Sequence, residues 1–121
     1  MAYILHTQYN SPNTDDRFIK LPAGRLGLHW WGRPIGQNPF GVCAWLSSQA
    51  SQVSAHDVIW PNNVAQLLEY NKPAWASGNY DENWRSIAFE CDPNDIEGTI
   101  PTIIERAADL VRNGILIEDF T

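Results

Sequence analysis

The sequence has 121 residues, 44% hydrophobic and 12% aromatic with six tryptophans, a composition that fits one folded domain and excludes a disordered tail. Its net charge of −6 and pI near 4.8 leave no cluster of Lys and Arg, which excludes a nucleic-acid partner. No stretch approaches the roughly 20 apolar residues of a membrane helix, and residues 1–10 lack signal-peptide features, so we expect no membrane partner and synthesis in the cytoplasm.

The first 24 residues are rich in turn-forming residues and show little periodicity, so they predict an irregular arm lying over the core. Residues 25–30 are dense in apolar residues that suit a β-strand, and Gly32 and Pro34 close the run. This segment is predicted to be a central strand.

An Asn-Pro pair at residues 38 and 39 is typical of a helix start, because Asn caps free N–H groups and Pro lacks one. Val42, Trp45 and Leu46 then follow at helical spacing. They predict a short amphipathic helix over residues 39–48.

Three further strands are expected after this helix. Residues 54–60 and 64–70 read as a β-hairpin, because the Pro-Asn-Asn segment between them suits a tight turn. Residues 85–90 form another strand candidate, which stops before Pro93.

The strongest helix signal spans residues 99–113, where apolar residues recur at three- and four-residue intervals and Gly114 is placed to end the helix. Residues 115–121 are long enough for one edge strand. Helices that alternate with strands predict an α/β fold, with a mixed central β-sheet flanked by helices and all 121 residues in a single domain.

The two cysteines, Cys43 and Cys91, are too few for a disulfide framework and lack the paired spacing of a zinc knuckle. We expect both to be reduced structural residues.

Three residues carry the candidate chemistry: His29 at the end of one predicted strand, His56 within another, and Glu90 at the end of a third. Strand ends at one edge of a sheet commonly point into a shared crevice. A metal site or a general-base site is one interpretation, and ordinary polar residues at a sheet edge are the other.

Several short motifs in a fixed order extend this pattern. They are LHWWG at residues 28–32, ASQVSAH at 50–56, AWASGN at 74–79 and SIAFE at 86–90. In this order they resemble the motif series of N-acetylmuramoyl-L-alanine amidases of the phage endolysin and peptidoglycan recognition protein superfamily. The resemblance implies an amidase-like domain that lacks the C-terminal part of the family fold.

The resemblance also implies roles for individual residues. His29 corresponds to a zinc ligand of the family, and Glu90 to a catalytic residue that assists proton transfer. Substrate contacts are implied for Trp30, His56, Trp75 and Asn79. The family alignment further predicts that His29 and Glu90 open into the same groove, with His56 close by on an adjoining strand. The implied substrate is bacterial peptidoglycan, which the family cleaves between muramic acid and L-alanine.

The tryptophans allow two interpretations: they form a platform for sugar rings, or they are core residues. We expect Trp31 and Trp45 to lie inside and Trp75 to line the cleft.

The sequence departs from the family pattern at several positions. Ala76 stands where the family usually has a histidine, and Asp57 stands where an aromatic residue commonly follows His56. No histidine follows His56, and the tail offers only the carboxylates of Glu118 and Asp119. Because a catalytic zinc site needs about three protein donors, zinc is expected to be absent or weakly bound.

Three hypotheses remain open from the sequence. The first is an amidase whose missing segment is supplied by a second polypeptide or has been cut away. The second is a non-catalytic module that keeps the cleft and binds peptidoglycan, or serves a structural role in a phage particle. The third is an unrelated small α/β protein with fortuitous motif matches. The first two place the protein's action at the cell wall or in a phage particle.

Overall fold

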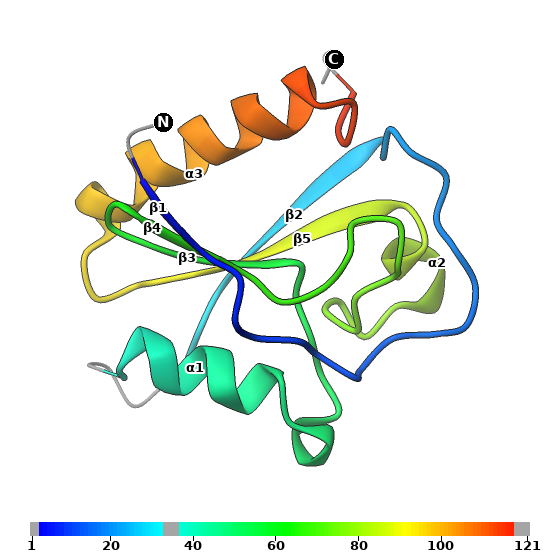
Figure 1. The fold of residues 1–121 in the computed structure, drawn as a ribbon, viewed down its shortest axis with the longest axis horizontal. Coiled ribbons are helices and arrows are strands. Elements are labelled where there is room, and N and C mark those ends of the chain that lie inside the picture. The colour runs from blue at the N-terminus through cyan, green and yellow to red at the C-terminus, as the bar shows by residue number, and fades with distance from the viewer. Residues whose placement is uncertain (1–2, 33–36, 118–121) are drawn as a thin grey trace.

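The computed structural model describes residues 3–32 and 37–117. A five-stranded sheet lies between two helices, with α3 (Ile96–Arg112) on one face and α1 (Pro39–Leu46) on the other (Figure 1). The predicted α/β class with a mixed sheet flanked by helices is confirmed. None of the helices in the described part of the chain is long and apolar enough to cross a membrane.

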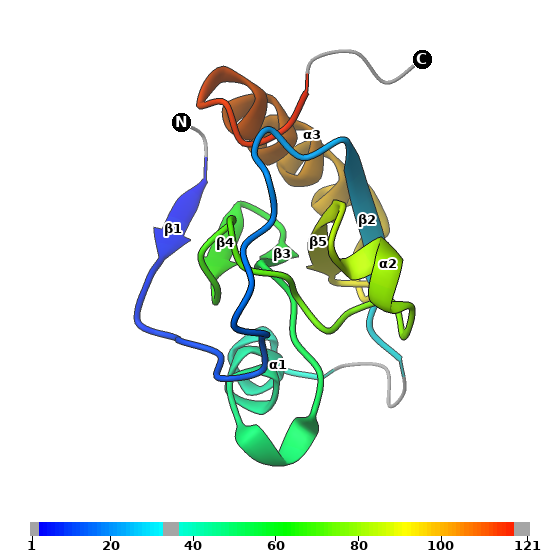
Figure 2. The same ribbon diagram turned by 90° about the vertical axis from the view of Figure 1, so that its right-hand side faces the viewer.

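The sheet has the strand order β1-β4-β3-β5-β2 and mixes parallel with antiparallel pairs. Only β3 and β4 pair antiparallel, while the other neighbours run parallel. β1 and β2 therefore lie at opposite edges of the sheet (Figure 2). The strands are β1 (Ile4–His6), β2 (Arg25–Trp30), β3 (Asp57–Trp60), β4 (Asn63–Gln66) and β5 (Ser86–Cys91).

The predicted hairpin is present, with shorter strands than the sequence suggested. Trp60 pairs with Asn63 across a turn in which Asn62 has a φ of 61°, a conformation that asparagine tolerates well. The N-terminal arm is not wholly irregular, because β1 pairs in parallel with β4. At the other end, Leu116 forms an isolated bridge with Ala23, and residues 118–121 lie outside the described part of the chain.

Side-chain caps fix where the helices begin. Asn38 caps α1 as predicted, since its side chain accepts a hydrogen bond from the backbone N–H of Phe40 at 2.9 Å. α3 begins earlier than predicted, because Asp95 caps it by accepting from the N–H of Gly98 at 2.9 Å. The structure adds α2 (Tyr80–Asn83) and a 3₁₀ turn at Gln49–Ser51.

Alternation along the strands places the two larger core clusters on opposite faces of the sheet. Phe89 and Cys91 pack towards α3, whereas Trp31 and Cys43 pack with α1 on the opposite face. Both cysteines are free and buried, as predicted, and Trp31 is inside at 8% exposure. Trp45 is not inside, because 56% of it is exposed.

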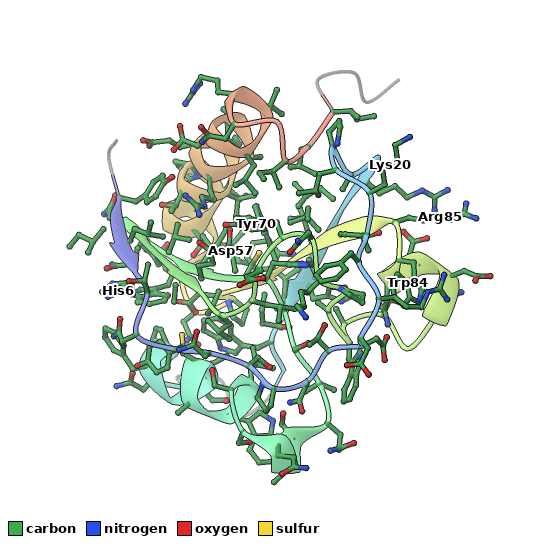
Figure 3. All side chains as sticks on the ribbon, turned by 45° about the vertical axis from the view of Figure 1, so that its right-hand side comes forward. His6, Lys20, Asp57, Tyr70, Trp84 and Arg85 are labelled. Atoms are coloured by element: carbon green, nitrogen blue, oxygen red, sulfur yellow. The ribbon has the colours of Figure 1, made fainter. Side chains whose placement is uncertain are left out.

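A buried polar network joins β3 to α3 and accounts for the charged residue after His56. Asp57 is fully buried and accepts a hydrogen bond from Arg106 Nε at 3.1 Å. Tyr70 donates to the same carboxylate at 2.8 Å, and Arg106 also donates to the hydroxyl of Tyr3. Figure 3 labels Asp57 and Tyr70 side by side beneath α3. Asp57 therefore holds the sheet to the helix and does not face the groove.

Candidate functional site

The carboxyl ends of β2 and β5 place His29 beside Glu90. The two residues are register partners in this parallel pair, so their side chains share one face of the sheet. They border a cavity of about 330 Å³ that α1 closes on its other side. The prediction that His29 and Glu90 open into the same groove is confirmed.

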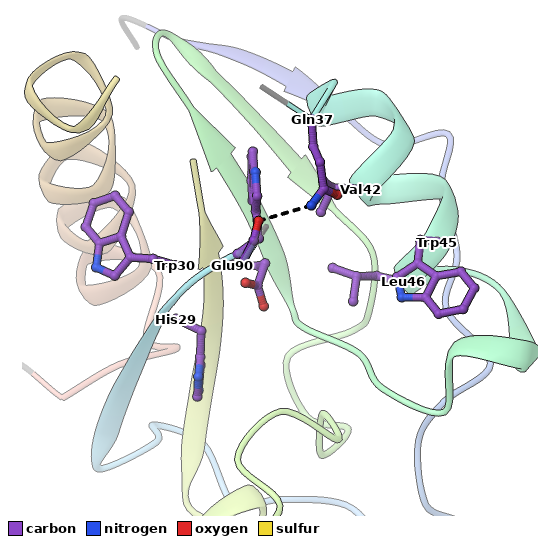
Figure 4. Close-up of a pocket in the computed structure, with 9 residues that line it drawn as sticks. His29, Trp30, Gln37, Val42, Trp45, Leu46 and Glu90 are labelled. Atoms are coloured by element: carbon purple, nitrogen blue, oxygen red, sulfur yellow. Dashed lines mark hydrogen bonds between the residues drawn. The ribbon is translucent and has the colours of Figure 1, made fainter. Parts of the chain in front are cut away.

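This groove takes its floor from the strand ends and its wall from the first helix (Figure 4). Gln37, just before α1, bonds back to the carbonyl of Gly32 at 3.1 Å and ties the two sides together. The described residues that line the groove are His29, Trp30, Trp31, Gly32, Gln37, Val42, Trp45, Leu46 and Glu90.

Glu90 is the acidic group of the groove. Its carboxyl is half-buried, and this burial raises its pKa to about 7. Among the described residues no side chain forms a hydrogen bond or ion pair with it. A carboxyl with these properties can exchange a proton near neutral pH or accept a hydrogen bond from a bound ligand.

His29 is half-buried and lies over Gly27, two residues earlier on the same face of β2. A Cβ at Gly27 would stand 3.7 Å from Nε2 of His29, so the glycine leaves the imidazole room. His29 also borders a second hollow of about 40 Å³, which Ala76 and Ser77 help to line. The position that carries a histidine in the family pattern therefore presents only a methyl group near His29.

Trp45 is the exposed aromatic residue of the groove wall, which corrects its predicted place in the core. The helix is short and apolar around most of its circumference, so its sequence does not mark one inward face. Val42, Cys43 and Leu46 fill the core, and the indole of Trp45 is left at the groove.

Trp30 does not offer its indole to the groove. Adjacent strand residues point to opposite faces, so Trp30 turns away when His29 faces the groove. Its register partner Cys91 belongs to the cluster beneath α3, and Figure 4 shows the indole directed to that side. Trp30 is among the residues that line the groove, but its indole points towards α3, so its predicted substrate contact stays a prediction.

Two other predicted substrate contacts, Trp75 and Asn79, lie outside this groove. Trp75 is half-buried and pairs through its backbone with Ser54. Asn79 is exposed and caps α2 by accepting from the N–H of Glu82 at 3.1 Å. Neither is among the described residues that line the groove.

His56 is a core residue in this structure. It is fully buried, and both ring nitrogens are occupied, with Nδ1 accepting from the N–H of Ala88 at 3.0 Å and Nε2 donating to the carbonyl of Lys72 at 2.6 Å. Burial also lowers its pKa to about 4, so the ring stays neutral. The structure brings His56 next to β5 but leaves it no free atom for a substrate.

No protein-family model matches the sequence, and no curated protein sequence matches it. Solved structures do match its fold. A mutant endolysin from Bacillus subtilis superposes with a TM-score of 0.78 at 15% identity, covering 94% of this chain and 79% of the endolysin. The Drosophila peptidoglycan recognition protein SD gives 0.74 at 14% identity, with 96% and 79% covered.

The Staphylococcus aureus hydrolase AmiA, solved in complex with its ligand, gives a TM-score of 0.75 at 13% identity, with 93% of this chain and 57% of AmiA covered. The chain has the amidase and peptidoglycan-recognition fold. The groove at the ends of β2 and β5 therefore lies in a domain that has the amidase fold.

The amidase resemblance implies zinc, so the donors in the groove can be compared with what zinc requires. Catalytic zinc uses about three protein ligands and one open position. The groove supplies one imidazole, His29, and one carboxylate, Glu90, and residues 3–32 and 37–117 bring together no three His, Cys, Asp or Glu side chains that could hold a metal. Glu118 and Asp119 lie outside these residues. The described donors do not fit a zinc site, and weak or absent zinc binding stays a prediction.

Proposed function

We propose that this chain is a peptidoglycan-directed domain of the amidase fold that binds muropeptides in the groove between α1 and the ends of β2 and β5. The observation that carries the proposal is the groove's lining, in which an exposed indole stands near a half-buried carboxyl and an imidazole. The shared fold of endolysins and peptidoglycan recognition proteins supports this choice of ligand.

The groove's shape and chemistry suit a sugar with a short peptide attached. Its volume of about 330 Å³ lies within the range of small-molecule sites, which is about 300–1,000 Å³. The apolar face of a sugar ring can stack on the indole of Trp45, as aromatic side chains offer a large flat surface. Glu90 and Gln37 add polar groups that can orient the amide bonds of the peptide.

A second candidate function is amidase activity completed by a second polypeptide. It is favoured by the placement of His29 and Glu90 as register partners in one groove, because a cleavage reaction needs polar groups that converge on one bond. For the isolated chain we expect no cleavage between muramic acid and L-alanine, since the described donors are too few for the family's metal chemistry.

Calorimetry with N-acetylmuramoyl-L-alanine amide tests the binding function. Trp45→Ala is expected to weaken binding roughly tenfold, because the sugar loses its stacking surface. Trp30→Ala is the matched control, since it removes an indole that faces α3, and its affinity is expected to stay within about twofold of the wild type. Equal affinities of wild type and Trp45→Ala would contradict the proposed site.

Incubation with purified peptidoglycan and excess zinc tests the second candidate. We expect the isolated chain to release no stem peptides above background. Release that disappears in His29→Ala would show that the chain completes a catalytic site by itself.

A further inference from the structure

The charged groups that line the groove bear on which peptide ends it can bind. Among its described lining residues the only titratable side chains are His29 and Glu90, and none is Lys or Arg. Arg33 follows Gly32 in the sequence but belongs to residues 33–36, which the structure does not describe. The described groove therefore offers an acid and no permanent cation.

The residues around Glu90 determine how well its charge is tolerated when a ligand fills the groove. Within the sheet its register partners are His29 on β2 and Val58 on β3, and the latter is fully buried. Across the groove α1 presents Val42 and Leu46, and its only titratable side chain is the buried thiol of Cys43. A ligand that fills the groove removes further water from the carboxylate, so the carboxylate requires a donor from that ligand.

We propose that Glu90 makes this groove selective for ligands that present an N–H donor, such as a carboxamide or an ammonium group, and against ligands that present a free carboxylate. The inference rests on the proposed muropeptide site and assigns its selectivity to one residue. A carboxamide can donate to the Glu90 oxygens, which no described side chain does. A ligand carboxylate would place two like charges together in a partly dry site.

The test compares N-acetylmuramoyl-L-alanine with its C-terminal amide by calorimetry, since the two ligands differ only in one carboxylate. At about pH 8.5 the wild-type chain is expected to bind the amide roughly tenfold more tightly than the acid. At the same pH Glu90→Gln should show a ratio within about twofold, because its side chain carries no charge.

The outcomes separate this inference from the proposed function. If both ligands bind the wild type equally at high pH, the selectivity is overturned while the muropeptide site stands, whether or not Arg33 offsets the charge. A preference that persists unchanged in Glu90→Gln would also overturn it. If neither ligand binds, the proposed function fails and the selectivity fails with it.

Discussion

Replacing Glu90 by glutamine is expected to stabilise the fold above neutral pH, because the native groove half-buries a carboxyl without a partner among the described residues. Burial raises its pKa from 4.5 to about 7. The folded state therefore binds the proton more tightly than the unfolded chain. The stability associated with the protonated carboxyl is fully present below pH 4.5 and is lost as the pH rises through about 7.

The two pKa values set an upper limit to this effect. They differ by about 2.5, from 4.5 to about 7, and one pKa unit corresponds to about 1.36 kcal/mol, so the loss at alkaline pH is at most about 3.4 kcal/mol. Partial solvent contact reduces it. Glu90→Gln removes the ionisation and should recover most of this loss.

Urea unfolding at about pH 5 and about pH 8.5 measures the effect in both proteins. The free energy of unfolding of Glu90→Gln, relative to that of the wild type, should increase when the pH is raised from about 5 to about 8.5. Glu69→Gln is the matched control, since it removes an exposed carboxylate outside the groove. If wild type and Glu90→Gln change in parallel with pH, or if Glu69→Gln produces the same gain, the account of Glu90 is refuted.

Asp57→Ala leaves the buried guanidinium of Arg106 without its carboxylate, so it should lower the free energy of unfolding in urea by about 3–5 kcal/mol. Removing the exposed cation of Arg112 should lower this free energy far less. A similar loss in both variants would contradict the role of the buried pair. His56→Ala should destabilise the fold by about 2–5 kcal/mol through a cavity and two broken hydrogen bonds, with no change in the muropeptide affinity of the folded protein. A large loss of affinity at unchanged stability would indicate that His56 belongs to the binding site. Asp95→Ala should lower the unfolding free energy by about 1 kcal/mol through loss of the α3 cap, and an unchanged midpoint would contradict that cap.

Periodic and local signals made most of the fold predictable from the sequence. The spacing of apolar residues predicted α3, and the dense apolar run predicted β2 at its observed bounds. β1 was missed because three residues carry no usable period and their pairing with β4 depends on contacts distant in the sequence. The start of α3 was placed late because Gly98 is a poor helix former, although Ile96 keeps the apolar spacing and Asp95 supplies the cap.

The sequence predicted those parts of the candidate site that strand geometry determines. His29 and Glu90 each lie near the end of a strand, and neighbouring parallel strands bring such positions together. Trp30 lies next to His29 in the sequence, but the two-residue period of a strand turns its side chain to the other face, so its substrate contact stays a prediction. Trp45 was missed because its apolar character is equally typical of a core position.

The assignment of the groove as the muropeptide site can be tested most directly by following the indole N–H signals of the six tryptophans in a ¹H–¹⁵N spectrum during titration with N-acetylmuramoyl-L-alanine amide. Because the indole of Trp45 stands exposed at the groove, its signal should move progressively and saturate with the ligand. The signals of Trp30 and Trp75, whose indoles face the α3 side of the sheet or lie outside the groove lining, should move far less. Saturable shifts at Trp75 with an unmoved Trp45 signal, or no shifts at all, would contradict the assignment.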